Sequence, residues 1–406
     1  MNFRSYEIKD ICKIKSGKRL PKGTDFSEKP TKHKYIRARD IKNGKIDGSD
    51  LGYISEETQK KIERYIVNTN DIIITIAGTI GEVALVSKKF DGVNLTENAV
   101  RLTEFSKDVC PEFLAYILKS PERKEYMEQV AGGSAQPKLG IYKIEAIKVD
   151  LPDVQIQHKI ADILSAYDNL IENNQKQIKL LEEAAQRLYK EWFVDLRFPG
   201  HENTKIVDGV PEGWRVASIA DICDTVGGGT PSTKIQSYYE KGDILWVTPT
   251  DITRNFSLAL LDTEKKITPE GLKNSSANML PAETILMTSR ASVGFFGMCK
   301  YEVCTNQGFI SCIPKRENLQ MYLLFNLKSR VEEIRQKAGG STYLEISKTV
   351  FRELKIILPK DEVLAEYQKN VHDIFDEIYC RTEMIKSLVD MRNRLLPKLM
   401  SGEVEV

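Results

Sequence analysis

The stretch AGGSTYLEISKTVFRELKIILP, residues 338–359, decides the fold because AGGSAQPKLGIYKIEAIKVDLP, residues 131–152, is a second version of it. Seven of the 22 aligned positions are identical, whereas chance would supply about one. Further segments match in the same order: YEIKDICKIKSGK (6–18) with VASIADICDTVGGG (216–229), YIRARDI (35–41) with WVTPTDI (246–252), and TIGEVALV (79–86) with SVGFFGMC (292–299). The sequence therefore predicts one duplication that covers nearly the whole chain.

Each copy changes its periodicity after the Leu-Pro pair that ends this phrase. Before it, β-branched runs such as DIIIT (71–75) and KIIL (355–358) alternate with Gly, Pro, Asn and Asp, which predicts strands, turns and a few short helices. Residues 153–193 contain no Gly or Pro, and apolar residues recur every three to four positions, which predicts a long helix. The predicted fold class is α+β, with two pseudo-symmetric β-rich domains that are each followed by a long helix.

Both predicted helices carry a heptad repeat. The seam positions are Ile160, Leu164, Tyr167, Ile171, Asn174, Ile178, Leu181, Ala185, Leu188 and Trp192 on the first helix, and Tyr367, Val371, Ile374, Ile378, Arg381, Ile385, Leu388, Arg392, Leu395 and Leu399 on the second. Two helices of equal length favour mutual pairing as a coiled coil; the alternative is that each lies on its own domain. We expect Asn174 and Arg381, at equivalent seam positions, to meet polar partners in neighbouring layers and to fix register or orientation.

The segment RFPGHENTKIVDGVPEGW is rich in Gly and Pro, which predicts a linker after the first helix. The predicted boundaries are a first domain at 1–152, a central long helix at 153–195, the linker at 196–213, a second domain at 214–359 and a C-terminal long helix at 360–402.

The composition is typical of a soluble globular protein, with 41% hydrophobic and 29% charged residues. The longest apolar run, IIITIAG, is far shorter than the ~20 residues that a membrane span requires. A charged amino terminus and seven cysteines without a CxxC pair favour a cytoplasmic location with free thiols.

The net charge of +1 conceals an uneven distribution. Residues 9–45 hold thirteen Lys and Arg against four acidic residues, whereas the equivalent window, 220–256, holds three against five. The first window predicts a face that binds a polyanion; the alternative is a solvated basic surface without a partner. Because the copies have diverged in charge, we expect two related but unequal targets.

The sequence offers little for catalysis. The segment VGGGTPSTK (226–234) lacks the Gly before the Lys and the Ser or Thr after it that a phosphate-binding loop requires. The four histidines have no metal-ligand spacing, and no dinucleotide-binding, zinc-protease or hydrolase motif is present. We therefore expect a chain that is not an enzyme and has neither a cofactor nor a metal.

Glycine-flanked loops recur in both copies: SGKRLPKG (16–23) with GGGTPSTK (227–234), AGTIG (77–81) with RASVG (290–294), TENA (96–99) with TNQG (305–308), and the two GGS segments. Their polar side chains can position phosphates and read base edges, although any one of them could be a simple turn. The expected DNA-binding residues are Lys18, Arg19, Lys22, Arg37, Arg39, Lys42, Thr79, Asn98, Ser134, Gln136, Lys138, Thr230, Ser232, Lys234, Thr248, Thr250, Arg254, Arg290, Ser292, Asn306, Gln307, Ser341, Thr342 and Tyr343.

Several segments resemble the specificity subunit of type I restriction-modification systems: KEWFVDLRFPG (190–200), GVPEGW (209–214), RLLPKLMSGEV (394–404) and the paired GGS and Leu-Pro segments. The resemblance covers essentially the full length. It implies two target recognition domains and an antiparallel coiled coil of the two long helices. It also implies binding to a bipartite, asymmetric site on double-stranded DNA, one half per domain.

The resemblance further implies two partners: modification subunits that methylate adenine with S-adenosylmethionine, present in two copies, and restriction subunits that translocate and cleave DNA. We expect Tyr189, Trp192 and Phe193 to dock the modification subunits; the alternative is that these aromatic residues pack against their own domain. The main competing hypothesis is a coiled-coil scaffold that holds other macromolecules outside a restriction system. A fused methyltransferase would need an NPPY-like segment, which the sequence lacks.

Overall fold

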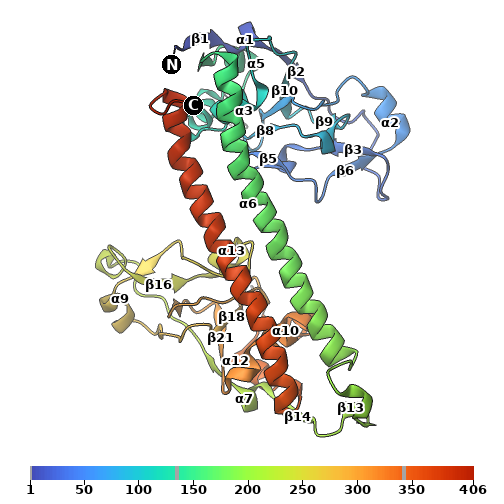
Figure 1. Cartoon of the computed structure of the whole chain (residues 1–406), viewed down its shortest axis with the longest axis vertical. Coiled ribbons are helices and arrows are strands. Elements are labelled where there is room, and N and C mark those ends of the chain that lie inside the picture. Colours follow the sequence, from blue (N-terminus) through green and yellow to red (C-terminus); the bar gives the residue numbers. More distant parts are fainter. Residues whose placement is uncertain (1, 133–136, 341–343) are drawn as a thin grey trace. The chain divides into compact units, whose positions relative to one another are not determined.

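The computed structural model describes residues 2–132, 137–340 and 344–406. The chain divides into two compact units: unit 1 comprises Met1–Asp168 with Met391–Val406, and unit 2 comprises Asn169–Asp390. Two long helices, α6 (Val154–Tyr189) and α13 (Asp361–Ser401), each contribute one segment to unit 1 and one to unit 2. Each unit therefore combines one β-rich domain with a stretch of both helices (Figure 1).

A four-stranded antiparallel sheet forms the centre of unit 1. Its strand order is β2 (Lys13–Ser16), β10 (Ala99–Thr103), β7 (Ile72–Thr75) and β8 (Val83–Leu85). Ile72 and Ile74 belong to one apolar cluster and Ile73 to another, so both faces of β7 are covered. This explains why the strand reads as an unbroken apolar run.

Shorter elements surround this sheet. The smaller strands are β1 (Arg4–Glu7) with β11 (Lys148–Leu151), β6 (Gly52–Ile54), β3 (His33–Ile36) and β9 (Asn94–Leu95) in that order, and β4 (Ile41–Lys42) with β5 (Lys45–Ile46). The helices are α1 (Ile8–Ile11), η1 (Ala38–Asp40), α2 (Glu56–Lys61), η2 (Lys88–Phe90), α3 (Pro111–Leu118), α4 (Pro121–Val130) and α5 (Ile141–Glu145). β3 and β9 pair in parallel, whereas the other pairs are antiparallel.

Unit 2 repeats this arrangement. Its four-stranded sheet has the order β15 (Cys223–Val226), β21 (Phe309–Pro314), β18 (Ile285–Thr288) and β19 (Phe296–Gly297). The smaller strands are β14 (Arg215–Ser218) with β22 (Lys355–Leu358), and β17 (Lys266–Ile267), β16 (Ile244–Val247) and β20 (Cys304–Thr305) in that order. The helices are α7 (Ile219–Ile222), η5 (Gln236–Tyr238), α8 (Pro249–Thr253), α9 (Pro269–Lys273), η6 (Glu317–Leu319), α10 (Gln320–Ser329), α11 (Val331–Lys337) and α12 (Lys348–Arg352). The parallel pair recurs as β16 with β20, so the predicted duplication is confirmed in the topology.

The segment that follows α6 begins with a π-helical turn, η3 (Lys190–Val194), and continues through η4 (His201–Asn203) to a hairpin. The strands β12 (Ile206–Val207) and β13 (Val210–Pro211) are joined by Asp208 and Gly209, whose φ angles are 50° and 79°. Positive φ at both central residues is the requirement of a type I′ turn, which Asp-Gly satisfies well.

The long helices pair along the predicted heptad seam. All twenty seam residues are buried or half-buried. In unit 2, Tyr367 Oη donates to the carbonyl of Ala185 at 3.4 Å, and Arg381 contacts Asn174. Residue numbers rise on one helix as they fall on the other, so the helices are antiparallel there (Figure 1). In unit 1, Ile160 and Leu164 of α6 share an apolar cluster with Leu399 of α13.

The two polar seam residues contact each other. Arg381 Nη1 donates to Asn174 Oδ1 at 3.0 Å, and Asn174 Nδ2 donates to the carbonyl of Leu170 at 2.8 Å. Arg381 Nη2 also forms an ion pair with Glu377 Oε1 at 2.6 Å. The expected polar partners are therefore present, but the principal one is the equivalent residue of the opposite helix rather than a residue of another layer.

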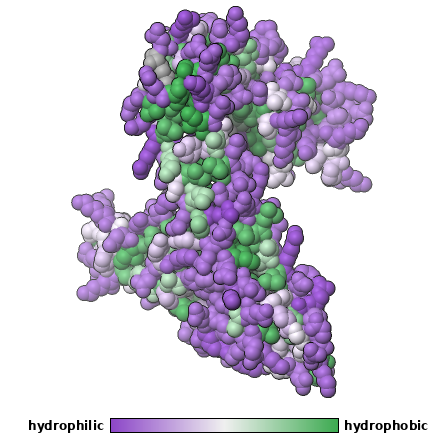
Figure 2. Space-filling view, viewed as in Figure 1, coloured by the Kyte–Doolittle hydropathy of each residue, from purple (hydrophilic) through white to green (hydrophobic). Residues whose placement is uncertain are grey.

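The surface is mostly polar. Hydrophilic residues cover most of the face seen in Figure 2, with smaller apolar areas between them. Six of the seven cysteines are buried, only Cys380 is exposed, and none forms a disulfide. Among the described residues, no helix has the length and apolar character needed to span a membrane.

Candidate nucleic-acid interface

Four loops of unit 1 meet at one end of its four-stranded sheet, where β2 and β7 end and β10 begins. Backbone hydrogen bonds join them: Gly17 N to Ala99 O at 3.1 Å, Lys18 N to Leu95 O at 2.8 Å, Ile76 N to Asn98 O at 2.8 Å, and Leu139 N to Ile76 O at 2.9 Å. We call residues 17–19, 76–79, 95–98 and 137–139 the first loop cluster. The loops that the sequence analysis selected separately thus form one surface.

Unit 2 builds the same surface from the matching loops. The joining bonds are Gly229 N to Thr305 O at 2.9 Å, Ser289 N to Gly308 O at 2.8 Å, Ala291 N to Leu344 O at 2.8 Å, and Ile346 N to Ser289 O at 3.0 Å. We call residues 227–230, 289–292, 305–308 and 344–346 the second loop cluster. The expected residues Ser134, Gln136, Ser341, Thr342 and Tyr343 lie outside the described residues.

An equivalent glycine allows the loops to approach in each cluster. A Cβ atom on Gly17 would lie 2.0 Å from the carbonyl oxygen of Thr96, and one on Gly228 would lie 2.0 Å from that of Thr305. Real Cβ atoms do not approach backbone oxygens so closely, so only glycine permits this contact. The shared glycine therefore has a packing role in both copies.

The first loop cluster presents positive charge together with one acidic residue. Lys18, Arg19 and Lys138 are exposed. Arg19 Nε donates to Glu97 Oε1 at 2.6 Å. Partial burial opposes it, but hydrogen bonds from Arg19, the backbone and Thr96 hold the pKa of the Glu97 carboxyl below its ordinary value. The Glu97 side chain is therefore charged at neutral pH.

The second loop cluster is more neutral. Thr230 Oγ1 donates to Gln307 Oε1 at 2.5 Å, and Arg290 lies 3.7 Å from Glu345 in an ion pair. Asn306 Oδ1 accepts from Gly308 N at 2.9 Å, so this side chain stabilises its own loop. Glu97 and Glu345 are not among the residues expected to bind DNA, which are mostly basic, amide and hydroxyl side chains. Their places within TENA (96–99) and the phrase that begins at residue 338 were the available signal.

Two expected DNA-binding residues instead cap short helices. Arg37 donates to Asp40 from Nε at 2.9 Å and from Nη2 at 2.8 Å, and Asp40 in turn caps the backbone of η1. Thr248 is bound in the same way, because its backbone N and Oγ1 both donate to Asp251 at 2.8 and 2.6 Å. Both side chains therefore have a local capping role, and their expected contact with DNA stays a prediction.

Other expected residues lie apart from the clusters or are locally neutralised. Arg39 pairs with Asp50 at 3.3 Å and Lys42 with Asp47 at 2.8 Å, so the excess of positive charge counted along residues 9–45 is partly cancelled by acids beyond that window. Lys22, Ser232 and Lys234 lie outside the clusters and are exposed, whereas Thr79, which is exposed, and Ser292, which is half-buried, belong to the clusters. Thr250 and Arg254 line a cavity with Thr382 and Ile385 of α13.

The expected docking residues for a protein partner are in the interior of unit 2. Tyr189 is 3% exposed and Trp192 is 7% exposed. Phe193 is half-buried, and its ring centroid lies 4.7 Å from that of Tyr322 and 4.8 Å from that of Tyr367. The burial of Tyr189 and Trp192 contradicts the docking prediction for these two residues. Tyr189 at the end of α6, and Trp192 and Phe193 in the π-helical turn, pack into their own domain, which was the alternative.

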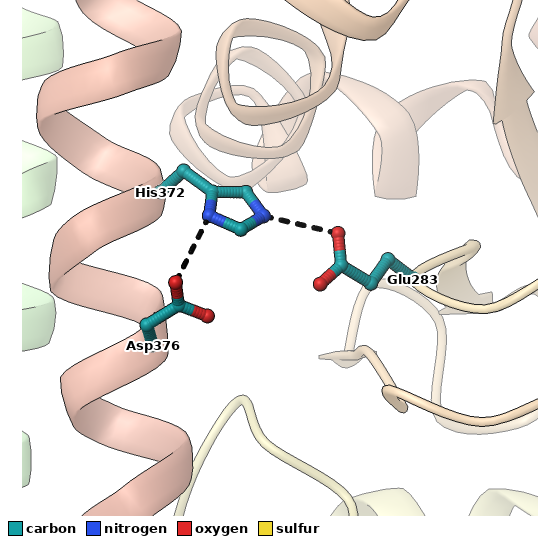
Figure 3. A group of neighbouring side chains, drawn as sticks. All are labelled: Glu283, His372 and Asp376. Carbon is teal, nitrogen blue, oxygen red and sulfur yellow. Dashed lines mark hydrogen bonds and ion pairs between the residues drawn. The ribbon is translucent and has the colours of Figure 1, made fainter.

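Within the described part of the chain, Glu283, His372 and Asp376 are close enough to be considered as metal ligands. Figure 3 shows the imidazole between the two carboxylates, with Nε2 at 3.1 Å from Glu283 Oε2 and Nδ1 at 3.3 Å from Asp376 Oδ2. Lys300 also pairs with Asp376. Because the carboxylates face opposite ring nitrogens and a lysine already neutralises one of them, we interpret the group as an ion-pair network that joins the turn at Glu283 to α13.

Known proteins share this organisation. The family model for the type I restriction modification DNA specificity domain matches residues 2–183 and again 211–389. The MjaIX specificity subunit of a type I restriction enzyme from Methanocaldococcus jannaschii is 28% identical over 379 residues, which cover 87% of this chain and 82% of that protein. The HindI specificity subunit from Haemophilus influenzae is 24% identical over 99% of this chain and 100% of its own length.

The fold also matches a solved structure. The crystal structure of the type I restriction-modification S subunit from M. genitalium aligns with a TM-score of 0.62 at 18% identity, covering 98% of this chain and 96% of that one. The likeness of the fold agrees with the two family matches, which fall on the two β-rich domains and much of the long helices. The chain therefore belongs to the family of type I restriction-modification specificity subunits.

Proposed function

We propose that this chain binds one bipartite, asymmetric site on double-stranded DNA, with one half-site for each loop cluster. The observation that carries the proposal is the matched assembly of four loops at the same end of the sheet in both units. Exposed Lys, Arg, Thr and Gln side chains on these loops have the donors and acceptors that phosphates and base edges require.

The two clusters would bind their half-sites by different balances of interaction. Lys18, Arg19 and Lys138 give the first cluster three exposed cations against one paired acid, whereas Arg290 of the second is already paired with Glu345. Phosphate contacts make binding depend on salt, and amide or hydroxyl contacts to bases depend on it less. We infer that the first half-site supplies most of the salt-dependent affinity.

The same proposal includes the recruitment of modification and restriction subunits, which membership of a restriction-modification family suggests. The buried aromatic residues are not available for this contact. The outer faces of the long helices carry exposed apolar residues that are available for it. Leu170 is 50% exposed, Leu180 63% and Met384 47%. We assign the docking of the partner subunits to these faces of α6 and α13.

The proposal is tested with the full chain co-expressed and co-purified with the modification subunits of the proposed restriction-modification system. Sequencing that detects methylated adenine should return one bipartite target in DNA treated with the complex and none in its absence. A complex that methylates without sequence preference, or a chain that does not bind DNA, would contradict the proposal. The second outcome would favour the competing hypothesis of a scaffold outside a restriction system.

Salt titration separates the two kinds of contact. Replacing Lys18 and Lys138 by Gln should lower affinity and reduce the slope of log K against log salt by about one per lost phosphate contact. The matched control is Lys107→Gln, an exposed lysine of unit 1 outside the cluster, which should leave the slope unchanged. If both variants had the same slope of log K against log salt, the first loop cluster would not make the proposed phosphate contacts.

A further inference from the structure

Each loop cluster contains one side-chain pair that joins the same two loops. In the first cluster, Arg19 of the glycine-rich loop bonds Glu97, and in the second, Thr230 bonds Gln307. Arg19 and Thr230 occupy the same position in the matched loops SGKRLPKG and GGGTPSTK. Their partners are one position apart in the matched loops, since Glu97 aligns with Asn306 and Gln307 with Asn98. Each copy therefore has a bond between the same two loops, an ion pair in the first and a neutral hydrogen bond in the second.

These pairs are not required to hold the loops together. Backbone bonds from Gly17 and Lys18, and from Gly229 in the second copy, already join the same loops. The Arg19 side chain is 80% exposed and that of Glu97 is 28% exposed. Exposed ion pairs contribute only about 0–1 kcal/mol to stability. The position of each pair on the proposed DNA surface is thus better explained by binding than by folding.

The chemistry of the first pair matches one kind of base pair. A carboxylate that faces DNA is repelled by phosphates, and in the major groove it can be satisfied only by an amino donor, which cytosine and adenine present. An adjacent arginine pairs best with the two acceptors of guanine. The edge of a single G·C pair presents both, so Arg19 and Glu97 together complement that edge.

The second pair suits the other kind of base pair. A glutamine amide can donate to N7 of adenine and accept from its N6 amino group. The hydroxyl hydrogen of the neighbouring threonine is already donated to this glutamine, so the threonine contributes its methyl group, which can contact the methyl group of thymine. Thr230 and Gln307, both exposed, are therefore matched to an A·T edge.

On the basis of the proposed function, we propose that Arg19 with Glu97 reads a G·C pair in the first half-site and that Thr230 with Gln307 reads an A·T pair in the second. The hydrogen bond within each pair orients both side chains before DNA arrives, so less side-chain freedom is lost on binding. The sequence difference between the half-sites thus follows from a difference in one cross-loop bond.

The test uses the complex of the chain with its modification subunits and a panel of duplexes. Each duplex carries one changed base pair of the target that methylation mapping returns for the unmodified complex. For that complex, changing the base pair read by Arg19 and Glu97 should weaken binding roughly 10- to 100-fold. In the double variant Arg19→Thr with Glu97→Gln, changing one G·C position of the first half-site should no longer weaken binding, so that the ratio of the two affinities is near one. Base changes in the second half-site should weaken binding as before.

The reciprocal variant and a control complete the test. Gln307→Glu should remove the penalty at one A·T position of the second half-site only. Lys138→Gln, in the first cluster but outside the pair, should weaken binding to every duplex by the same factor. Unchanged penalties at all positions in both pair variants would overturn the inference. A complex that has no sequence preference before any substitution would instead overturn the proposed function.

Discussion

Replacing the polar pair in the helix seam should make unit 2 more stable, and the reason lies in what the pair leaves unsatisfied. Asn174 is 3% exposed and bonds Arg381, but among the described residues Arg381 Nε has no hydrogen-bond partner although it is buried. The perturbation is the set Asn174→Leu, Arg381→Leu and the double variant. Each single change leaves the other polar residue without this hydrogen bond, whereas the double change makes this layer of the seam apolar.

The magnitudes follow from these contacts. Asn174→Leu removes a hydrogen bond to a charged group, which contributes about 1.5–3 kcal/mol, and the new apolar contacts offset part of this loss. Arg381→Leu leaves the Asn174 amide oxygen without its donor, at a cost of about 1–3 kcal/mol, with a similar offset. The double variant should be about 1–4 kcal/mol more stable than the parent, as found where buried ionic groups are replaced by packed apolar ones. The predicted non-additivity is the sum of the two single-variant losses and the double-variant gain, and so exceeds about 1 kcal/mol.

The chain provides its own probe for this measurement. All three tryptophans, Trp192, Trp214 and Trp246, lie in unit 2, which also holds both seam residues. Thermal unfolding followed by tryptophan fluorescence therefore reports the relevant unit, and the double variant should melt roughly 2–16 °C higher. A double variant less stable than either single variant, or a coupling below about 0.5 kcal/mol, would refute the reasoning. If methylation by the complex also persists unchanged, the pair does not fix helix orientation.

Three further outcomes are expected. Burial lowers the pKa of Lys119 from 10.5 to about 8, although the attraction of Asp168 opposes this. Between pH 8 and pH 10.5 the unfolded chain therefore binds more protons than the folded chain. As the pH rises through this range, unit 1 should become more stable by at most about 3 kcal/mol. Hydrogen exchange of unit 1 should show this gain, and Lys119→Met should abolish it. His372→Gln should lower the fluorescence melting temperature of unit 2 by a few degrees (roughly 2–4 °C), because the network in Figure 3 is partly exposed and contributes about 1 kcal/mol or less; no change would remove its structural role. Gly17→Ala should displace residues 95–98 and abolish recognition of the first half-site, whereas Gly132→Ala, where the nearest contact to the new Cβ is 3.9 Å, should not.

The local and periodic parts of the fold were predictable from the sequence. The repeat predicted two copies of one topology, and the heptads predicted which helix residues are buried, because periodicity of 3.5 residues places them on one face. The sequence also placed Asn174 and Arg381 at equivalent seam positions. It did not predict that they contact each other, since this depends on the relative shift of two segments about 200 residues apart, which only the antiparallel register determines.

The candidate site was predicted at the level of loops but less well at the level of side chains. Glycine-flanked loops are local signals, so the loops themselves could be identified, whereas their meeting at one end of the sheet is seen only in the structure. The partner of a given side chain is not local. Arg37 has the charge and the donor groups expected of a phosphate contact, yet its side chain forms hydrogen bonds with an aspartate three residues later. The heptad places Trp192 in the buried seam, but that its ring packs against Tyr367, 175 residues later, is not a local signal.

The two copies share the bonds that shape their loops and differ in the exposed side chains that these loops carry. Thr75 Oγ1 donates to the carbonyl of Thr79, and Thr288 Oγ1 donates to that of Ser292, so each hairpin turn is fixed by the same bond. The loops are then joined by backbone bonds and a buried glycine rather than by the exposed side chains. Substitutions at Arg19, Glu97, Thr230 or Gln307 should therefore leave the loop framework intact. A scaffold of this kind can change the base that it reads by exchanging one or two exposed side chains, because the free energy that shapes the surface does not depend on them.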